Sequence, residues 1–310
     1  MSFFEEFKFQ SSDGKSAIYA LKCLPDGEPR GVVQIAHGIA EHIDRYREFM
    51  EFLANNGFVV VGNDHLGHGK SIAEDGSNKG IFCKDNGWNK VVKDMVELHD
   101  IMAADYPNAK YIMFGHSMGS FLTRTYIIDY PDKYDLAILS GTGHQSKLLI
   151  SGGNLMAAAL TALNGYESDG TKLSNIAFGS YLSKIDNPRT EYDWLTHDES
   201  VVDRYLIDDN CGFTCKTGLY GDMMKGIKYI TDFKNIRKMN PDKPVYFMSG
   251  KEDPVGDYGK GVEKAYSLFC KAGLKDVAVK LYDGGRHEML NEINKAEVMN
   301  DILNWLNERV

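Results

Sequence analysis

No segment of the 310-residue sequence is apolar enough to cross a membrane. The longest comparable run, residues 155–160 (Leu-Met-Ala-Ala-Ala-Leu), falls far short of the about 20 apolar residues that a membrane-spanning helix needs. The N-terminus is acidic at Glu5 and Glu6, where a secretory signal would be basic. We therefore expect no secretory signal and no stable membrane insertion.

Positive charge and cysteine are also scarce. The sequence has 35 Lys and Arg against 44 Asp and Glu, a net charge of −9, which argues against a surface that binds nucleic acid or anionic lipid. The 5 cysteines are odd in number and scattered, which predicts reduced thiols in a cytoplasmic protein rather than a disulfide framework. Cys211 and Cys215 lack a second ligand pair at zinc-site spacing, so we expect no metal there.

What the sequence does contain is a regular alternation of short apolar runs and helical periodicity. Apolar and polar residues alternate in the segments 6–10 and 16–24, which are separated by the turn sequence Ser-Ser-Asp-Gly. This pattern predicts an antiparallel hairpin at a sheet edge. The runs that follow are almost continuously apolar, as in parallel strands buried on both faces. This pattern predicts an α/β fold with a mostly parallel, doubly wound sheet. Its runs are 31–36, 58–61, 111–114 and 136–139, separated by helical stretches at 46–55, 88–105 and 121–130.

The alternation lapses in the middle of the chain and then resumes. Residues 142–240 hold several glycine-rich turns and helical pieces but no clear buried strand. We therefore predict one α/β core, residues 1–141 and 241–310, with a helical insertion at 142–240. The resumed core contains predicted strands at 245–248 and 277–282 and predicted helices at 257–271 and 296–308.

A candidate nucleophile lies where the run at 111–114 passes into a helix. Residues 115–119 read Gly-His-Ser-Met-Gly, a G-x-S-x-G pentapeptide between a predicted strand and a predicted helix. In this position a tight turn lifts the Ser117 hydroxyl clear of its neighbours, and the flanking glycines let the chain bend. The context, rather than the pentapeptide itself, makes Ser117 the predicted nucleophile.

A serine nucleophile needs a base and an orienting carboxylate, which follow it in the order acid, then histidine. Asp253 follows a late predicted strand and is the best acid, ahead of its neighbour Glu252 and of Asp257, for which helix capping is the simpler role. His287 follows the last predicted strand, on a glycine-rich loop, and is the only histidine beyond Asp253. We therefore predict a Ser117, Asp253, His287 triad.

The negative oxygen formed during acyl transfer needs two backbone N–H donors. One is expected from Met118, which follows the nucleophile, and the other from Ile39, in the loop after the strand at 31–36. His37, in the same loop, is expected to hold that loop in shape. His65 and His68 have metal-ligand character, but the glycines around them favour a tight supporting loop.

Four motifs resemble the monoacylglycerol lipase and lysophospholipase branch of the α/β-hydrolases. Residues 37–46 look like its H-G-x-x-E-H-x-x-R-Y signature, 64–71 its D-x-x-G-H-G-x-S segment, and 115–120 its nucleophile turn. His287-Glu288-Met289-Leu290-Asn291-Glu292 matches its H-E-x-x-N-E ending, and 187–195 resembles a segment of bacterial members. The resemblance implies a serine hydrolase of acyl esters such as monoacylglycerols or lysophospholipids, an α/β-hydrolase fold with the insertion as a cap, the same triad and oxyanion donors, and no cofactor.

Two alternatives remain open at this stage. A serine aminopeptidase or amidase could use the same core, with acidic residues near the cleft to bind a free amine; Glu191, Asp193, Asp198 and Glu199 could supply them. A non-catalytic ligand-binding relative is the other.

Which residues of the insertion bind substrate is unknown. The apolar residues of the insertion are expected mostly to pack on the core, with some facing the cleft. These are Leu148, Leu149, Ile150, Leu155, Met156, Leu160, Phe178, Tyr181, Leu182, Met223 and Met224.

Overall fold

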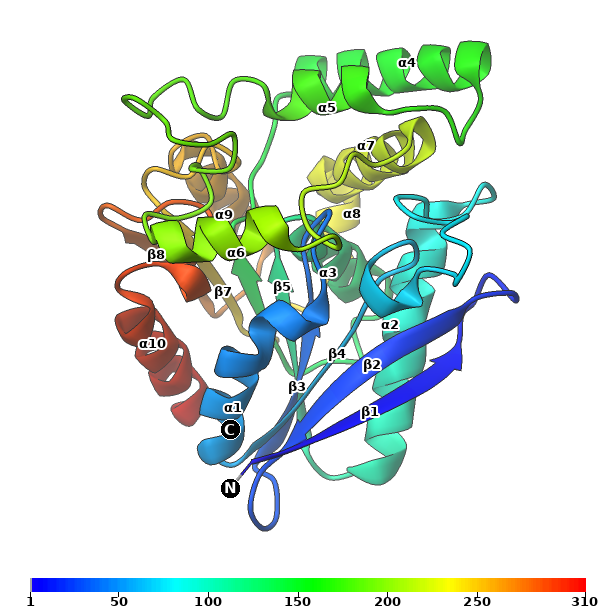
Figure 1. The fold of residues 1–310 in the computed structure, drawn as a ribbon. Helices are drawn as coiled ribbons and strands as arrows, with labels where there is room; N and C mark the ends of the chain where they lie inside the picture. Colours follow the sequence, from blue (N-terminus) through cyan, green and yellow to red (C-terminus); the bar gives the residue numbers. More distant parts are fainter. Residues whose placement is uncertain (1) are drawn as a thin grey trace.

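An eight-stranded sheet forms the centre of the molecule (Figure 1). The computed structural model describes residues 2–310. β1 and β2 form the predicted antiparallel hairpin at one edge, β2 also runs antiparallel to β4, and all later neighbours are parallel, in the order β1-β2-β4-β3-β5-β6-β7-β8. The predicted fold class is confirmed. The strands are β1 (Phe3–Gln10), β2 (Ala17–Leu24), β3 (Gly31–Ala36), β4 (Phe58–Asn63), β5 (Lys110–His116), β6 (Leu136–Ser140), β7 (Val245–Gly250) and β8 (Val277–Tyr282).

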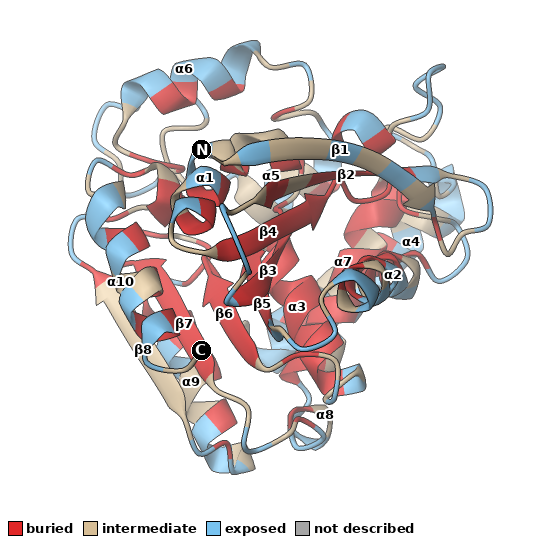
Figure 2. Cartoon of the chain, turned by 90° about the horizontal axis from the view of Figure 1, so that it is seen from below, coloured by how far each residue is buried: buried red, intermediate tan, exposed pale blue. Residues whose placement is uncertain are grey.

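Helices cover both faces of the sheet, which is why its central strands are apolar almost throughout (Figure 2). Successive side chains of β5 enter opposite cores: Ile112 and Phe114 on one face, Tyr111 and Met113 on the other. On the first face lie α1 (Arg47–Asn55) and α10 (Lys295–Asn307). On the second lie α2 (Gly87–Asp105), α3 (Met118–Asp129) and α9 (Lys260–Ala272).

The inserted segment, residues 142–240, lies between β6 and β7 and covers the end of the sheet at which the parallel strands finish (Figure 1). Its helix α7 packs on α3, and Leu219, Met223 and Ile227 join the core on that side. The helices of the segment are α4 (Lys147–Asn164), α5 (Thr171–Phe178), α6 (Glu199–Ile207), α7 (Thr217–Thr231) and α8 (Phe233–Ile236).

Most of the apolar insertion residues named from the sequence pack on the core as expected, but α4 also carries exposed ones. Leu148, Leu155 and Leu163 are 85%, 74% and 80% exposed, because α4 rests on α7 through its other face, at Ile150 and Ala157. α4 therefore presents an apolar outer surface. None of the helices within residues 2–310 combines the length and the apolar character needed to span a bilayer.

Two helices, α2 and α9, begin without a side-chain cap. Asn86 occupies the position before α2, but it has a left-handed backbone (φ 59°) and its side chain caps no helical N–H. Asp257 does not cap α9, which begins at Lys260 after Gly259, and Asp257 itself has φ 49°. Both chain segments turn through left-handed residues, so the backbone path rather than side-chain capping sets the helix start.

Candidate active site

Ser117 sits in the sharp turn between β5 and α3. Its backbone (φ 53°, ψ −123°) lies in a region that costs a residue with a side chain about 1–3 kcal/mol. The flanking glycines are required by close packing: a Cβ on Gly115 would come within 2.4 Å of Thr123 Oγ1, and one on Gly119 within 2.0 Å of Ala36 O. The turn therefore projects the Ser117 side chain from the end of the sheet, as the motif predicts.

The structure brings Asp253 and His287 together. β7 and β8 are adjacent and parallel, so the loops that follow them meet at one edge of the sheet. His287 Nδ1 and Asp253 Oδ1 are 3.0 Å apart, and both side chains are buried. The Asp253 carboxylate also accepts hydrogen bonds from the Val255 N–H (2.9 Å) and the Ser249 hydroxyl (3.0 Å). This fixes the carboxylate and leaves Nε2 as the histidine nitrogen available for proton transfer.

Glu252, the neighbouring acid, is exposed and pairs with His197 instead, at 3.4 Å. The Ser117 hydroxyl makes no hydrogen bond to another residue within 2–310. It lines the same cavity as His287, and the ring of His116, the preceding residue, lies 4.7 Å from the His287 ring between centroids.

The charges of the pair stabilise each other. Burial by itself would lower the pKa of His287, but the charge of Asp253 and the hydrogen bond to it raise that pKa above its ordinary value. Burial would raise the pKa of Asp253, but His287 and the hydrogen bonds from Val255 and Ser249 lower it. The site therefore holds an ionised carboxylate beside an imidazole that readily accepts a proton.

Ile39 and Met118 have the free N–H groups expected of oxyanion donors. Within the described residues, neither backbone N–H donates to a protein acceptor. The Gly38 N–H, by contrast, is held by Glu41 Oε1 at 2.5 Å and is unavailable. His37 supports this loop as expected, because its Nε2 accepts the His65 N–H at 3.0 Å. Burial, followed by the neighbouring His65 and His68, keeps the pKa of His37 well below its ordinary value.

A buried ion-pair network connects the two loops of the site. Arg45 donates two hydrogen bonds of 2.7 Å to the carboxylate of Glu288, the residue after His287, and one of 2.5 Å to Glu41. Its guanidinium also lies over the Tyr205 ring, 4.8 Å from the centroid. Glu41 holds the loop after β3, here called the oxyanion loop because it contains the predicted donor Ile39. Glu288 belongs to the loop after β8, here called the histidine loop because it contains His287, so Arg45 sets the relative position of the two loops.

Replacing Arg45 by methionine is expected to lower the free energy of unfolding by about 3–5 kcal/mol, since two buried carboxylates lose their cation. In the wild type, burial would raise the pKa of Glu288, but Arg45 lowers it to about 2. Glu288 then stabilises the fold above its unfolded-state pKa, and this contribution is lost as pH falls toward 2. Without Arg45, burial raises the pKa of Glu288, so the free energy of unfolding falls as pH rises and this buried carboxyl group ionises.

Chemical denaturation at pH 5 and pH 8 checks this prediction: the deficit of Arg45→Met should be larger at pH 8. Arg204→Met is the matched control, because Arg204 is exposed and should change stability by less than about 0.5 kcal/mol. An equal deficit at both pH values would show that the network does not act through charge.

A cavity of about 470 Å³ lies between these loops and the inserted segment. Of the apolar insertion residues considered from the sequence, Phe178 and Leu182 line it. Sequence reasoning missed the hydroxyl and amide groups that α5 adds to the cavity wall, from Thr171, Ser174 and Asn175. A mixed wall of this size suits a small amphiphilic ligand.

Trp194 is a second missed residue. Its indole lies 5.1 Å from the His287 ring between centroids and is in turn packed against Phe178 and Tyr181. The backbone carbonyls of Trp194 and Leu195 accept the N–H groups of His287 (3.4 Å) and Glu288 (2.7 Å). The inserted segment thus contacts the histidine loop directly.

Of the four acidic residues suggested for amine binding, Glu191 alone lines the cavity within the described chain. Asp193 accepts the N–H groups of Arg189 and Thr190 (2.5 and 3.2 Å), and Asp198 caps α6. Glu199 faces solvent. The other two carboxylates that line the cavity within the described residues, Glu41 and Glu288, are both paired with Arg45, so Glu191 is the one cavity carboxylate without a cation partner there.

Comparison with known proteins places these features in context. Residues 27–294 match the model of the Hydrolase_4 family, described as serine aminopeptidase, S33. The monoacylglycerol lipase of Mycolicibacterium smegmatis is 27% identical over 303 residues, 97% of this chain and 96% of that protein. The monoglyceride lipase of Mus musculus is 25% identical over 92% of this chain and 85% of its own length. A thermostable carboxyl esterase from Bacillus coagulans, solved with glycerol, is 32% identical with a TM-score of 0.92, covering 99% of this chain and 98% of its own.

Proposed function

The chain belongs to the Hydrolase_4 family of α/β-hydrolases, and from this premise we propose that it is a serine hydrolase in which Ser117, Asp253 and His287 form the catalytic triad. Relatives that are monoglyceride lipases and a carboxyl esterase support its assignment as a carboxylic ester hydrolase. One observation carries the proposed site: the hydrogen-bonded Asp253–His287 pair adjoins a cavity also lined by Ser117 and Ile39.

In the proposed mechanism Ser117 attacks the ester carbonyl while His287 Nε2 takes its proton. Asp253 stabilises the imidazolium that results. The negative oxygen is held between the Ile39 and Met118 N–H groups, which have no competing protein acceptor. His287 then protonates the departing alcohol, an acyl-enzyme remains, and water activated by His287 releases the acid.

The proposed substrate is a small acyl ester such as a monoacylglycerol, with a lysophospholipid or another acyl ester as the alternative. We propose that residues 142–240 act as a cap on a core formed by 1–141 and 241–310. Phe178 and Leu182 from this cap supply apolar wall for an acyl chain, and the hydroxyl and amide groups of α5 supply partners for a polar alcohol. The apolar outer surface of α4 would allow the cap to meet aggregated lipid without insertion. A cytoplasmic location remains a prediction.

A substrate panel tests the function. Monoacylglycerols and p-nitrophenyl esters of increasing chain length, lysophosphatidylcholine and an aminoacyl p-nitroanilide should be compared by kcat/KM. We expect the esters to exceed the anilide by at least about 100-fold, because Arg45 already pairs with Glu41 and Glu288 and leaves Glu191 alone among the described cavity carboxylates to bind a free amine. Faster turnover of the anilide would favour the aminopeptidase alternative, for which Glu191 is the remaining amine ligand.

A further inference from the structure

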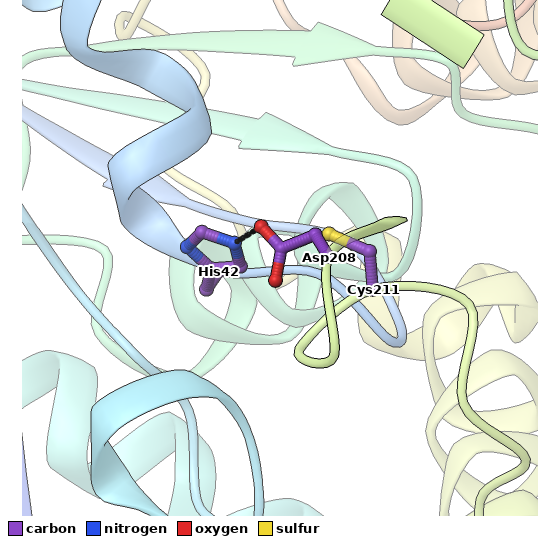
Figure 3. A group of neighbouring side chains, drawn as sticks. All are labelled: His42, Asp208 and Cys211. Carbon is purple, nitrogen blue, oxygen red and sulfur yellow. Dashed lines mark hydrogen bonds and ion pairs between the residues drawn. The ribbon is translucent and has the colours of Figure 1, made fainter. Parts of the chain in front are cut away.

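Three metal-ligating side chains from distant parts of the sequence meet where the inserted segment joins the core (Figure 3). His42 follows the oxyanion loop, and Asp208 and Cys211 lie in the turn after α6. His42 Nε2 and Asp208 Oδ2 are 2.9 Å apart, and the potential ligand atoms of all three residues lie within 4.8 Å of one another. We propose that these residues form a zinc-binding site that links the inserted segment to the core. The spacing of Cys211 and Cys215 predicts no such site, because the partners of Cys211 in the structure are His42 and Asp208 rather than Cys215.

The donor set fits zinc. One imidazole nitrogen, one carboxylate oxygen and one sulfur are each accepted by Zn²⁺, whereas Mg²⁺ and Ca²⁺ prefer oxygen alone. A tetrahedral zinc ion with bonds of about 2.0–2.3 Å holds its ligand atoms roughly 3.3–3.8 Å apart, so closing the site needs shifts on the order of 1 Å. Water would complete the fourth position.

Two of the ligands are already constrained. Asp208 Oδ1 accepts the Asn210 N–H at 2.8 Å, which directs Oδ2 toward His42. The Cys211 N–H donates to the Asp208 carbonyl at 2.9 Å, which fixes the turn. The buried Cys211 thiol makes no hydrogen bond to any residue in the described part of the chain. Its sulfur is therefore available to a metal.

The local charge also favours a cation. The side chains of Glu41, Glu288 and Asp208 lie around this joint, and among the described residues Arg45 is the only lysine or arginine paired with any of them. With His42 counted as neutral, three carboxylates against one guanidinium leave a formal charge of −2. Burial raises the pKa of Cys211 despite the nearby Arg45, so zinc must displace the thiol proton, which passes to solvent as the Zn–S bond forms. Zinc also replaces the hydrogen bond between His42 Nε2 and Asp208 Oδ2, and the proton of Nε2 moves to Nδ1 so that the neutral imidazole can bind the ion.

The position gives the ion a structural consequence. Gly212, next to Cys211, donates its N–H to the Ala40 carbonyl at 2.9 Å, and the Tyr205 hydroxyl donates to the same carbonyl at 3.1 Å. Ala40 follows Ile39, the proposed oxyanion donor. A zinc ion would add bonds from His42 to the turn at 208–211 and so hold the inserted segment against the oxyanion loop.

The test uses the full-length, chelator-treated protein and Zn²⁺ alone, with binding measured by competition with a chromogenic zinc indicator. We expect one ion per chain, and at least about 100-fold weaker binding in Cys211→Ser and in Asp208→Asn. Zn²⁺ should raise the melting temperature of the wild type, while Mg²⁺ should not. Because binding expels a proton, zinc affinity should rise between pH 6 and pH 8.

Cys270→Ser is the matched control, because Cys270 is an exposed thiol outside the cluster and its loss should leave zinc affinity unchanged. Circular dichroism without zinc must show that both cluster variants are folded. Equal zinc affinity and stoichiometry in folded wild type, Cys211→Ser and Asp208→Asn would overturn the proposal. So would a loss in Cys270→Ser as large as in the cluster variants. Neither readout depends on ester hydrolysis.

Discussion

Ser117→Ala is expected to reduce kcat for ester hydrolysis on the order of 10⁴–10⁶-fold, because the variant has no hydroxyl to form the acyl-enzyme. The fold should be retained, since alanine keeps the Cβ and the Ser117 hydroxyl makes no hydrogen bond within residues 2–310. Stopped assays with p-nitrophenyl butyrate measure the loss. A fluorophosphonate probe should label the wild type and leave Ser117→Ala unlabelled.

Ser151→Ala is the control for this experiment, because Ser151 is exposed on α4 and lies outside the proposed site. It should keep full labelling and kcat. Residual labelling of Ser117→Ala at the wild-type rate would mean that another serine is the nucleophile. An unlabelled wild type would instead favour the non-catalytic ligand-binding alternative.

The core strands could be predicted from sequence because a parallel sheet buried on both faces demands continuous apolar runs. The strand at 31–36 coincides with β3 as observed, and the run at 111–114 lies inside β5. Strand order along the chain then places Ser117, Asp253 and His287 in loops at the same end of the sheet. Such residues are predictable since each is set by a strong local signal and one topological rule.

The rest of the site depends on contacts with no local signal. Arg45 and Glu288 are 243 residues apart in the sequence, and nothing near either of them specifies the other. Trp194 meets His287 only because the inserted segment folds back over the core. The exposed apolar residues of α4 have the sequence pattern of a helix that packs on a core. Apolar periodicity does not distinguish a helix face buried against protein from one exposed to solvent or lipid.

Asp253→Asn is expected to lower kcat by about 10⁴-fold, because the variant loses the charge that stabilises the His287 imidazolium and selects its tautomer. It should also change the pH profile. In the wild type Asp253 raises the pKa of His287 against the effect of burial, and activity falls as pH drops through that pKa because the base becomes protonated. Removing the charge lowers the pKa of His287, so the acidic limb of kcat should move to lower pH.

The control is Glu252→Gln, which changes an exposed neighbour whose carboxylate pairs with His197 and should alter kcat by less than about threefold. Asparagine can keep the local packing, because its oxygen can accept the Val255 N–H while the Ser249 hydroxyl turns to accept from the amide. A folded Asp253→Asn variant with an unmoved acidic limb would show that the Asp253 charge does not act on the base. If Asp257→Asn instead caused the larger loss of kcat, Asp257 would be the acid of the triad. Asp257 lies four residues after Asp253 in the same loop and has a left-handed backbone.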